Sequence, residues 1–315
     1  MNSKKALISG VTGQDGAYLA KLLLSKGYKV FGTFRRTSTP NFWRLQYTDV
    51  YSKINLIPAD LTDMGSLINA MKISDPDEVY NMAAMSFVRT AFEQPVGNSH
   101  STGTAVTRFL ESIKAINPNV KFYQASSSEM FGNSNVDFQN EQTPFSPASP
   151  YAAAKLYAHW ITKIYQEAYD MFAVSGILFN HESPIRGLEF VTRKITNAAA
   201  QIKLGLKKDI SIGNLQSKRD WGYAPEYMEA IYLMMQQDKP ETYVVSTGET
   251  YSVEELARVS FEILNLDWKD YVKTDEKYFR PLYINLLRGN YSKAKDELGW
   301  EPKTKFHELI KLMVN

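Results

Sequence analysis

Short apolar runs alternate with amphipathic stretches through the first half of the chain. The strand-like runs cover residues 5–11, 29–34, 54–60, 78–84 and 120–128. Helix-like stretches separate them, and parallel strands joined by helices require right-handed crossovers. The pattern therefore predicts the α/β class, as a doubly wound parallel sheet of the Rossmann type with helices on both faces.

The second half of the chain is less periodic. Its helix-like stretches cover residues 151–172, 191–205 and 226–237, and a buried strand is expected at 173–180. Ser252 stands three residues before Glu255, and this capping-box spacing predicts that a helix begins there. We therefore expect a second, smaller α/β unit.

A glycine-rich segment follows the first predicted strand and opens the first predicted helix, with the spacing G-x-x-G-x-x-G. Glycines at these positions allow a tight turn and a close approach of the backbone to a pyrophosphate, and the helix N-terminus favours the anion. A glycine triplet by itself is equally typical of a simple turn, but its position at the start of a βαβ series favours a dinucleotide. The expected cofactor contacts in this segment are Gly10, Thr12, Gly13, Gln14, Asp15 and Gly16.

Two arginines follow the second predicted strand, where an acidic residue would bind the ribose 2′-hydroxyl of NAD. Arg35 and Arg36 instead suit bidentate contact with a 2′-phosphate, so the sequence favours NADP, and a solvated arginine pair is the alternative. Asp60 and Leu61, after the third strand, are placed for the adenine edge, although an Asp at a strand end is commonly a helix cap.

No internal repeat, low-complexity segment or linker rich in Pro and Gly separates the two halves. We therefore predict two interleaved domains with a ligand cleft between them. The NADP-binding domain is assigned to residues 1–178 and 219–248, and the smaller substrate-binding α/β domain to residues 179–218 and 249–315.

Composition narrows the functions that this chain can have. Its 315 residues are 44% hydrophobic, enough for a substantial core. There is no cysteine, which excludes a disulfide scaffold and a thiol nucleophile, and the four histidines are scattered, so no metal site is expected. The 36 basic and 34 acidic residues nearly balance, which argues against a nucleic-acid binder. No apolar run could span a membrane, so we expect a soluble cytoplasmic protein.

Tyr151 and Lys155 are one helical turn apart, so a phenol and an ammonium share one side of the long predicted helix. The cation is expected to lower the pKa of the phenol, which could then act as a base, and to hold the nicotinamide ribose. Ser127 and Glu129 end an apolar strand that points to the same edge of the sheet, where a carboxylate could move carbon-bound protons. The alternatives are surface decoration for the Tyr-Lys pair and a helix-capping or surface charge for Glu129.

With these motifs, the chain resembles the GDP-mannose 4,6-dehydratase family of extended short-chain dehydrogenases over nearly its whole length. The resemblance is carried by blocks such as FYQASSSEMFG, SPYAAAKLYAHWIT, NHESPIRG and GNLQSKRDWG. It implies that the catalytic residues are Ser127, Glu129, Tyr151 and Lys155. It implies that the cofactor is also contacted by Ala83, Ala84, Ser86, Tyr151, Lys155, His181 and Arg186. It implies that the substrate, a GDP-hexose, is contacted by Ser86, Asn180, Val191, Lys194, Arg219 and Arg280.

The same resemblance implies an internal redox cycle. Tyr151 takes the proton of the sugar O4 while a hydride leaves C4 for NADP, and the resulting ketone acidifies C5. Glu129 then removes the C5 proton, the C6 hydroxyl leaves as water, and the hydride returns to C6. In relatives resembling the dTDP-glucose and CDP-glucose enzymes an Asp precedes the Glu as a separate acid. Ser128 stands there in this chain, so Glu129 has to serve both steps.

The chain departs from the family pattern at three positions. Ser127 stands where the family has Thr, a change that keeps the hydroxyl. Met85 stands where the family has Gln, which removes a hydrogen-bonding group near cofactor and substrate. Tyr283 replaces an acidic residue of the family's nucleotide site. A GDP-heptose or a GDP-N-acetylhexosamine, such as GDP-N-acetylglucosamine, is therefore an alternative substrate.

Other activities stay open on the sequence alone. Epimerases, 4-keto reductases and decarboxylases of this superfamily share the Ser-Tyr-Lys set, although the NHESPIRG and KRDWG blocks favour a dehydratase. A non-catalytic NADP-binding sensor is the alternative from another class, and the intact set of four catalytic residues argues against it. The short loop after Arg36 resembles that of family members that assemble as homodimers or homotetramers.

Overall fold

The computed structural model describes residues 3–279 and 281–315. Within these residues, seven strands form one sheet in the order β11-β6-β5-β4-β1-β2-β3, and every neighbouring pair is parallel. The strands are β1 (Lys5–Ser9), β2 (Lys29–Phe34), β3 (Asn55–Pro58), β4 (Glu78–Asn81), β5 (Lys121–Ser127), β6 (Ala173–Leu178) and β11 (Tyr243–Val245). The predicted doubly wound α/β fold is confirmed.

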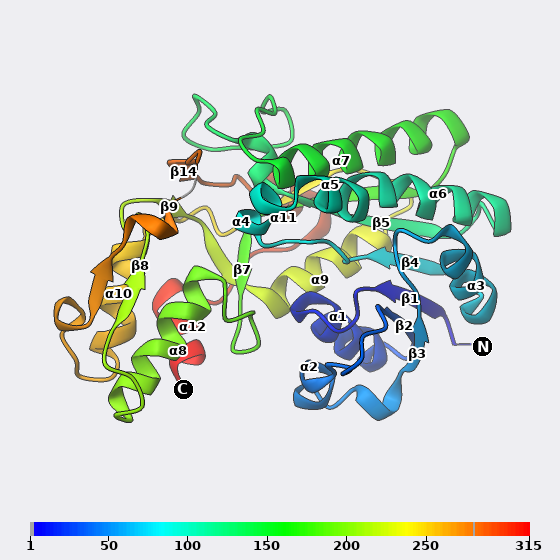
Figure 1. Ribbon diagram of the computed structural model, residues 1–315. Helices are drawn as coiled ribbons and strands as arrows, with labels where there is room; N and C mark the ends of the chain where they lie inside the picture. Colours follow the sequence, from blue (N-terminus) through cyan, green and yellow to red (C-terminus); the bar gives the residue numbers. More distant parts are fainter. Residues whose placement is uncertain (1–2, 280) are drawn as a thin grey trace.

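Helices cover both faces of this sheet (Figure 1). On one face lie α1 (Gln14–Ser25) and α9 (Ala224–Met235), and on the other α3 (Met64–Ser74), α6 (Ala105–Ile116) and α7 (Pro150–Tyr169). Shorter helices are α2 (Trp43–Tyr47), α4 (Val88–Glu93) and α5 (Pro95–Asn98). Helix α7 ends three residues before the predicted boundary, because Asp170 adopts a left-handed conformation with φ of 53°. No helix within residues 3–279 or 281–315 combines the length and the apolar composition that crossing a bilayer requires.

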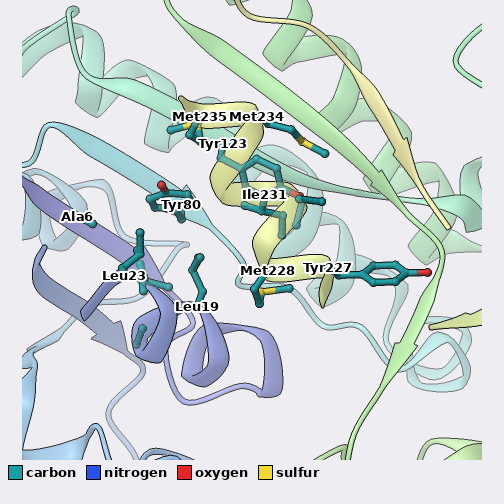
Figure 2. Close-up of a cluster of buried hydrophobic side chains, with 14 of the residues drawn as sticks. Ala6, Leu19, Leu23, Tyr80, Tyr123, Tyr227, Met228, Ile231, Met234 and Met235 are labelled. Atoms are coloured by element: carbon teal, nitrogen blue, oxygen red, sulfur yellow. The ribbon is translucent and has the colours of Figure 1, made fainter. Parts of the chain in front are cut away.

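The main hydrophobic core lies between the sheet and the helices α1 and α9 (Figure 2). Leu19 and Leu23 of α1 and Ile231 of α9 are fully buried there, and each such side chain stabilises the fold by about 1.5–3 kcal/mol. Tyr80 and Tyr123 line the sheet side of the core, with ring centroids 6.2 Å apart. This packing holds α1, and with it the glycine-rich loop, at the carboxyl end of β1.

The order of the strands reverses between β1 and β4, and doubly wound sheets bind ligands at such a point. Gly10 has a φ of +71° there, and a Cβ at this position would lie 2.8 Å from the Cα of Ala83. A Cβ on Gly16 would lie 2.5 Å from the carbonyl oxygen of Gly10. Glycine at both positions therefore lets α1 begin directly against β1 and the loop after β4.

A smaller lobe lies at the left of Figure 1. Its helices are α8 (Val191–Lys203), α10 (Val253–Glu262) and α12 (Phe306–Val314). Its strands pair as β7 (Asn180–Glu182) with β10 (Trp221–Tyr223), β9 (Lys218–Arg219) with β12 (Tyr251–Ser252) and β14 (Leu286–Leu287), and β8 (Ile210–Ile212) with β13 (Val272–Thr274). The predicted capping box of α10 is confirmed, because the Ser252 hydroxyl accepts from the Glu255 N–H at 3.0 Å and the Glu255 carboxylate accepts from the Ser252 N–H at 2.7 Å.

Helix α11 (Ser292–Leu298) belongs by sequence to the predicted substrate-binding domain, yet it packs on the first core. Ala294, Leu298 and Trp300 share their hydrophobic cluster with Leu19 and Leu23 of α1. The chain thus crosses between the two units again near its end. The predicted domain boundaries remain a prediction. They assign α11 to the substrate-binding domain, whereas this helix packs against the core of the sheet.

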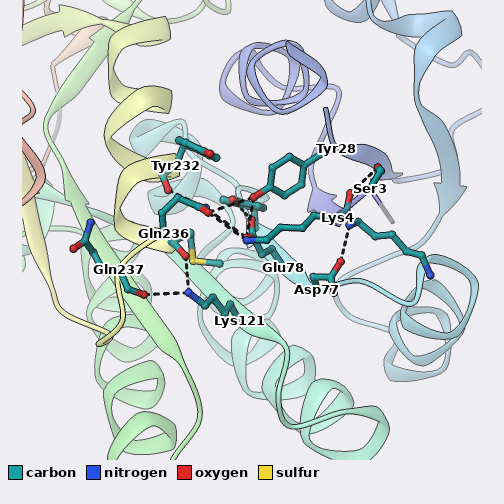
Figure 3. Close-up of polar contacts among 12 residues, drawn as sticks. Ser3, Lys4, Tyr28, Asp77, Glu78, Lys121, Tyr232, Gln236 and Gln237 are labelled. Atoms are coloured by element: carbon teal, nitrogen blue, oxygen red, sulfur yellow. Dashed lines mark hydrogen bonds and ion pairs between the residues drawn. The ribbon is translucent and has the colours of Figure 1, made fainter. Parts of the chain in front are cut away.

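A buried carboxylate, Glu78, joins elements at the amino end of β4 (Figure 3). It accepts hydrogen bonds from the hydroxyls of Tyr28 at 3.0 Å and Tyr80 at 2.6 Å, and it pairs with the Lys4 ammonium at 3.1 Å. The Gln236 amide, just after α9, also reaches Glu78 at 3.4 Å. A buried charge is tolerated only when it is paired and hydrogen-bonded, so this network stabilises the contact of β4 with the start of β2 and the end of α9.

We predict that Glu78→Ala lowers the free energy of unfolding by about 3 kcal/mol, since it leaves the hydroxyls of Tyr28 and Tyr80 without their shared acceptor. Urea denaturation measures this change. Glu229→Ala, an exposed position on α9, is the control and should change stability by less than about 0.5 kcal/mol. Equal losses in the two variants would contradict the role of Glu78.

Candidate active site

A cavity of about 280 Å³ lies between the sheet and the smaller lobe. One wall comes from the end of β5 and the start of α7, and the other from β7, α8 and the successive strands β9 and β10. The residues predicted from the sequence that line it are Asp15, Ala84, Ser86, Ser127, Glu129, Tyr151, Lys155, Asn180, His181, Arg186, Val191, Lys194 and Arg219. A cavity at the boundary of two units is the typical place for a ligand.

The carboxyl end of β5 brings a hydroxyl and a carboxylate to this cavity. Ser127 is the last residue of β5, and its hydroxyl accepts from the Glu129 N–H at 3.3 Å at the start of a 3₁₀ turn, η3 (Ser128–Phe131). Glu129 lines the cavity but is only 8% exposed, so it is not a surface charge. The same serine hydroxyl lowers the pKa of the Tyr151 phenol.

The first turns of α7 supply the phenol and the ammonium. Ser149 caps the helix by accepting from the Ala152 N–H at 3.1 Å, which places Tyr151 and Lys155 on the face toward β5. The Lys155 ammonium donates to the carbonyl oxygen of Ala125 at 2.6 Å and lies 5.9 Å from the centre of the Tyr151 ring. Both side chains are buried, so the pair is not surface decoration.

Burial is the largest influence on the pKa values of Tyr151 and Lys155. It raises the pKa of Tyr151 well above its usual value, more strongly than Ser127 lowers it, and the charge of Glu129 raises it further. Burial also lowers the pKa of Lys155 to about 8. The predicted lowering of the phenol's pKa is therefore not found in the chain by itself, where the Lys155 ammonium donates to the Ala125 carbonyl.

An ion pair between two residues that line the cavity joins α1 to β7. The carboxylate of Asp15 lies 3.0 Å from Nε2 of His181, whose Nδ1 donates to the Phe179 carbonyl oxygen at 2.7 Å. Burial disfavours the charged form of both groups, but the attraction between the two charges has the larger effect. The pKa of Asp15 therefore lies below its usual value, and the pKa of His181 lies above it. The His181 ring also stacks on Tyr227 of α9, with ring centroids 4.8 Å apart.

Beside this pair, a second ionic contact lies on the lobe side of the cavity. Arg186 stands 3.2 Å from the carboxylate of Glu182, and its guanidinium lies 3.6 Å from the centre of the Phe190 ring. Burial raises the pKa of Glu182, although Arg186 and the hydroxyl of Thr192 work in the opposite direction. These contacts hold the loop between β7 and α8 in place.

The glycine-rich loop fits a dinucleotide phosphate. Helix α1 begins after Gly13 with no side chain capping its first turn, which leaves the N–H groups there available to an anion. Gly10 and Gly16 have no room for a Cβ, and Gly13 would bring one to 3.3 Å from the Gly10 carbonyl. The backbone of Thr12 accepts from Arg44 at 3.5 Å, which helps to fix the loop.

Several predicted residues lie away from the cavity. Arg35 and Arg36 are exposed after β2. The Asp60 carboxylate accepts from the N–H and hydroxyl of Thr62 at 2.8 and 2.7 Å, so it shapes the turn before α3, while Leu61 is partly buried against the core. The predicted residues outside the cavity lining also include Gly10, Thr12, Gly13, Gln14, Gly16 and Ala83. Arg280 lies outside the described residues.

Met85, predicted to lie near cofactor and substrate, is also absent from the cavity lining. Its N–H donates to the Thr102 hydroxyl at 3.2 Å, and its carbonyl accepts from the Asn98 amide at 2.9 Å. Tyr283, by contrast, lines the cavity. Its carbonyl oxygen accepts from the amide of Asn133 at 2.7 Å, which ties its segment to the turn after η3.

Sequence reasoning missed a cationic corner of the cavity. Tyr278 ends a 3₁₀ turn, η5 (Glu276–Tyr278), and its ring centre lies 3.8 Å from the Lys194 ammonium, 5.0 Å from that of Lys277 and 5.8 Å from the guanidinium of Arg89. The Lys194 ammonium also donates to the Ser211 carbonyl oxygen at 2.7 Å. No local sequence signal connects these residues, because they come from α4, α8 and η5. Over the described ranges, His, Asp and Glu side chains form no group of three or more that could hold a metal ion.

Comparison with known proteins gives consistent matches along the chain. A family model described as GDP-mannose 4,6 dehydratase matches residues 7–313. GDP-mannose 4,6 dehydratase 2 of Arabidopsis thaliana is 51% identical over 322 residues, with 99% of this chain and 86% of that protein covered. The GDP-mannose 4,6 dehydratase of Homo sapiens is 44% identical over 336 residues, with 98% of this chain and 90% of that protein covered.

Solved structures share the fold at lower identity. The dTDP-glucose 4,6-dehydratase of Bacillus anthracis, solved in complex with NAD, superposes with a TM-score of 0.85 at 21% identity. The superposition covers 99% of this chain and 96% of that one. At this identity the likeness shows that the two chains have the same fold.

We predict that Asp15→Asn lowers the pKa of His181, because it removes the charge that favours the imidazolium. A raised histidine pKa contributes stability that is fully present below the unfolded value of about 6.5 and is lost as pH rises through the folded pKa. The variant should therefore lose stability mainly at acidic to neutral pH. NMR titration of the imidazole signals measures the shift.

His159 is an internal reference for that titration. Burial lowers its pKa to about 4, and its ring bonds to Ser126 rather than to Asp15. Its titration should be the same in the wild-type protein and in Asp15→Asn. An unchanged His181 curve, or parallel shifts in both histidines, would contradict the ion pair.

Proposed function

The chain belongs to the GDP-mannose 4,6-dehydratase family, and we propose that it converts GDP-mannose to GDP-4-keto-6-deoxymannose with a bound nicotinamide cofactor. The observation that carries the proposal is that Ser127, Glu129, Tyr151 and Lys155 line one cavity. Oxidation of a sugar hydroxyl to a ketone, or reduction of that ketone, needs only the serine, tyrosine and lysine beside the nicotinamide. Loss of water needs a further acid-base group, and Glu129 supplies it.

We propose that the cofactor is NADP, bound along the carboxyl ends of β1 and β2. The open N-terminus of α1 would receive the pyrophosphate, Arg35 and Arg36 the 2′-phosphate, and Asp60 and Leu61 the adenine edge. The exposure of both arginines leaves them accessible to such a phosphate. When bound, the nicotinamide would supply a hydride acceptor that later returns the hydride, and its oxidised form would carry a positive charge.

We propose that Tyr151 takes the proton of the sugar O4 hydroxyl. Its phenol is buried and its pKa is raised, so it needs stabilisation by nearby positive charge before it can act as a base. Lys155 can supply that charge below pH of about 8, where its ammonium keeps the proton. Ser127 lowers the pKa of the phenol and lines the same cavity, where it would orient the same hydroxyl.

We propose that Glu129 performs both proton transfers of water loss. A ketone at C4 acidifies the C5 proton, which the carboxylate removes, and the acid so formed protonates the C6 hydroxyl as it leaves as water. No second carboxylate from the residue before it is available, because that position is Ser128. When the hydride returns to C6, C5 takes up a proton from solvent by way of the same carboxylate, so solvent deuterium is expected to enter the sugar at C5.

We propose that the GDP moiety lies along the lobe side of the cavity. Lys194 and Arg219 would contact the diphosphate there, together with Arg280, and Asn180, Val191 and Ser86 would contact the rest of the substrate. The Arg219 guanidinium donates from Nη1 to the carbonyl oxygens of Lys218 at 2.8 Å and Ile284 at 2.9 Å, so its orientation is fixed before any ligand binds. Cations held in this way suit an anionic ligand.

The product formed from a panel of GDP-sugars tests the substrate. GDP-mannose should give a product lighter by one water. Tyr283, which departs from the family pattern, lines the cavity, so GDP-heptose and GDP-N-acetylglucosamine are the competing substrates. If either is converted faster than GDP-mannose, that sugar nucleotide is the substrate instead. Absence of turnover with any nucleotide sugar would contradict the proposal and favour an NADP-binding sensor. The cytoplasmic location stays a prediction from the sequence.

We predict that Glu129→Gln slows water loss from GDP-mannose by about 10²–10⁴-fold, because the amide cannot remove the C5 proton. Solvent deuterium should no longer enter the sugar, while cofactor binding stays unchanged. Glu189→Gln, at an exposed carboxylate on the cavity rim, is the matched control and should keep wild-type turnover. Normal water loss in Glu129→Gln would remove this residue from the mechanism.

We propose a homodimer formed through α6 and α7, which lie side by side on one face of the sheet (Figure 1). Tyr157, Trp160 and Ile164 follow a helical spacing on α7 and are 43%, 46% and 50% exposed. The Tyr157 hydroxyl bonds to Thr107 of α6 at 2.9 Å, which joins the two helices into one surface. A second copy of the chain would bury this apolar stripe against itself.

We predict that Trp160→Glu weakens dimerisation by about a hundredfold or more, because it would place an unpaired charge in the interface. Light scattering after size-exclusion chromatography measures the mass. Leu206→Glu, which also replaces an exposed apolar residue but lies after α8, should leave the mass unchanged. A Trp160→Glu protein of wild-type mass would rule out this interface.

A further inference from the structure

The segment that contains β9 and β10 presents alternating side chains to the substrate side of the cavity. Ser217, Arg219 and Trp221 all line the cavity. Lys218 is exposed, and the Asp220 carboxylate turns away to accept from backbone N–H groups after β11 and β14. Because successive residues of an extended chain point to opposite sides, one face of this segment carries a hydroxyl, a guanidinium and an indole.

The hydroxyl of Ser217 is buried and has no hydrogen-bond partner among the described residues. The residue is 8% exposed although it lines the cavity. Its own backbone is held in place, since its carbonyl oxygen accepts from the Val253 N–H at 3.2 Å. Buried polar groups in folded proteins nearly always have a partner, so a donor left open toward a ligand cavity points to a ligand atom.

We propose that the Ser217 hydroxyl donates a hydrogen bond to a phosphoryl oxygen of the nucleotide diphosphate that Arg219 binds. The inference rests on the proposed function, which places a GDP-sugar in this cavity. Two residues along an extended chain are roughly 6.6 Å apart, so a hydroxyl and a guanidinium on the same face can reach one diphosphate. Phosphoryl oxygens are charged acceptors that offer no competing donor, and bonds to them are stronger than bonds between neutral groups.

A second buried hydroxyl in the chain gives a matched control. Ser246 follows β11, is fully buried and likewise has no hydrogen-bond partner in the described part of the chain. It does not line the cavity. Loss of its hydroxyl therefore tests what removing a buried, unpartnered serine oxygen does when no ligand is near.

The experiment compares the affinities of the purified full-length protein for GDP and for guanosine by calorimetry, with guanosine measured in competition. Ser217→Ala should weaken GDP binding about tenfold, the loss expected for one hydrogen bond to a charged group, and leave guanosine binding unchanged. Ser246→Ala should match the wild-type protein with both ligands. Ser217→Thr, which keeps a hydroxyl, should retain most of the GDP affinity.

Three results would overturn the inference. GDP affinity within about twofold of wild type in Ser217→Ala would show that the hydroxyl has no phosphate partner. An equal loss of affinity for GDP and guanosine would indicate that the hydroxyl contacts the nucleoside and not the diphosphate. A wild-type protein that binds neither GDP nor GDP-mannose would reject the proposed function and this inference together, whereas the first two results leave the proposed function standing.

Discussion

The direct contact of helix α1 with strand β1 is the constraint on which the rest of the structure depends. A side chain at Gly16 would collide with the carbonyl of Gly10, and one at Gly10 would collide with Ala83, so the approach exists only with glycine at both positions. The contact leaves the first N–H groups of α1 open to an anion. It also aims Asp15 at His181, so the loop that suits a phosphate is the one that anchors the smaller lobe.

Helix α1 also positions the strands on the lobe side of the cavity. The Gln14 side chain donates to the carbonyl oxygen of His181 at 3.0 Å and accepts from the hydroxyl of Ser183 at 2.7 Å, so α1 holds β7 by side chains as well as by charge. Strand β7 pairs with β10, which continues from the segment that carries Arg219. The lobe that receives the substrate is therefore tied through α1 to the sheet that carries Glu129 and Tyr151.

Sequence pattern predicted the elements whose signals are local and missed those that depend on distant partners. Alternating strands and helices, the capping box at Ser252 and the glycine spacing can all be recognised within a dozen residues, and the structure contains each of them. The cationic corner around Tyr278 could not be predicted, because Arg89, Lys194 and Lys277 meet only after three elements have packed. The pKa of Tyr151 was misjudged for a related reason. Helical spacing places Lys155 on the same face, but only the fold shows that its ammonium bonds to Ala125.

The two walls of the cavity are built in physically different ways. Ser127, Glu129, Tyr151 and Lys155 come from the end of one central strand and the start of one long helix, so their relative positions are fixed by the core of the sheet. The residues facing them come from short strands and turns of the smaller lobe, such as β9 and η5. Tyr283 and Ser217 lie on that second wall. A substitution there can change which nucleotide sugar is held while the proton-transfer groups stay in register, which is why departures from the family pattern on this wall are compatible with an unchanged reaction.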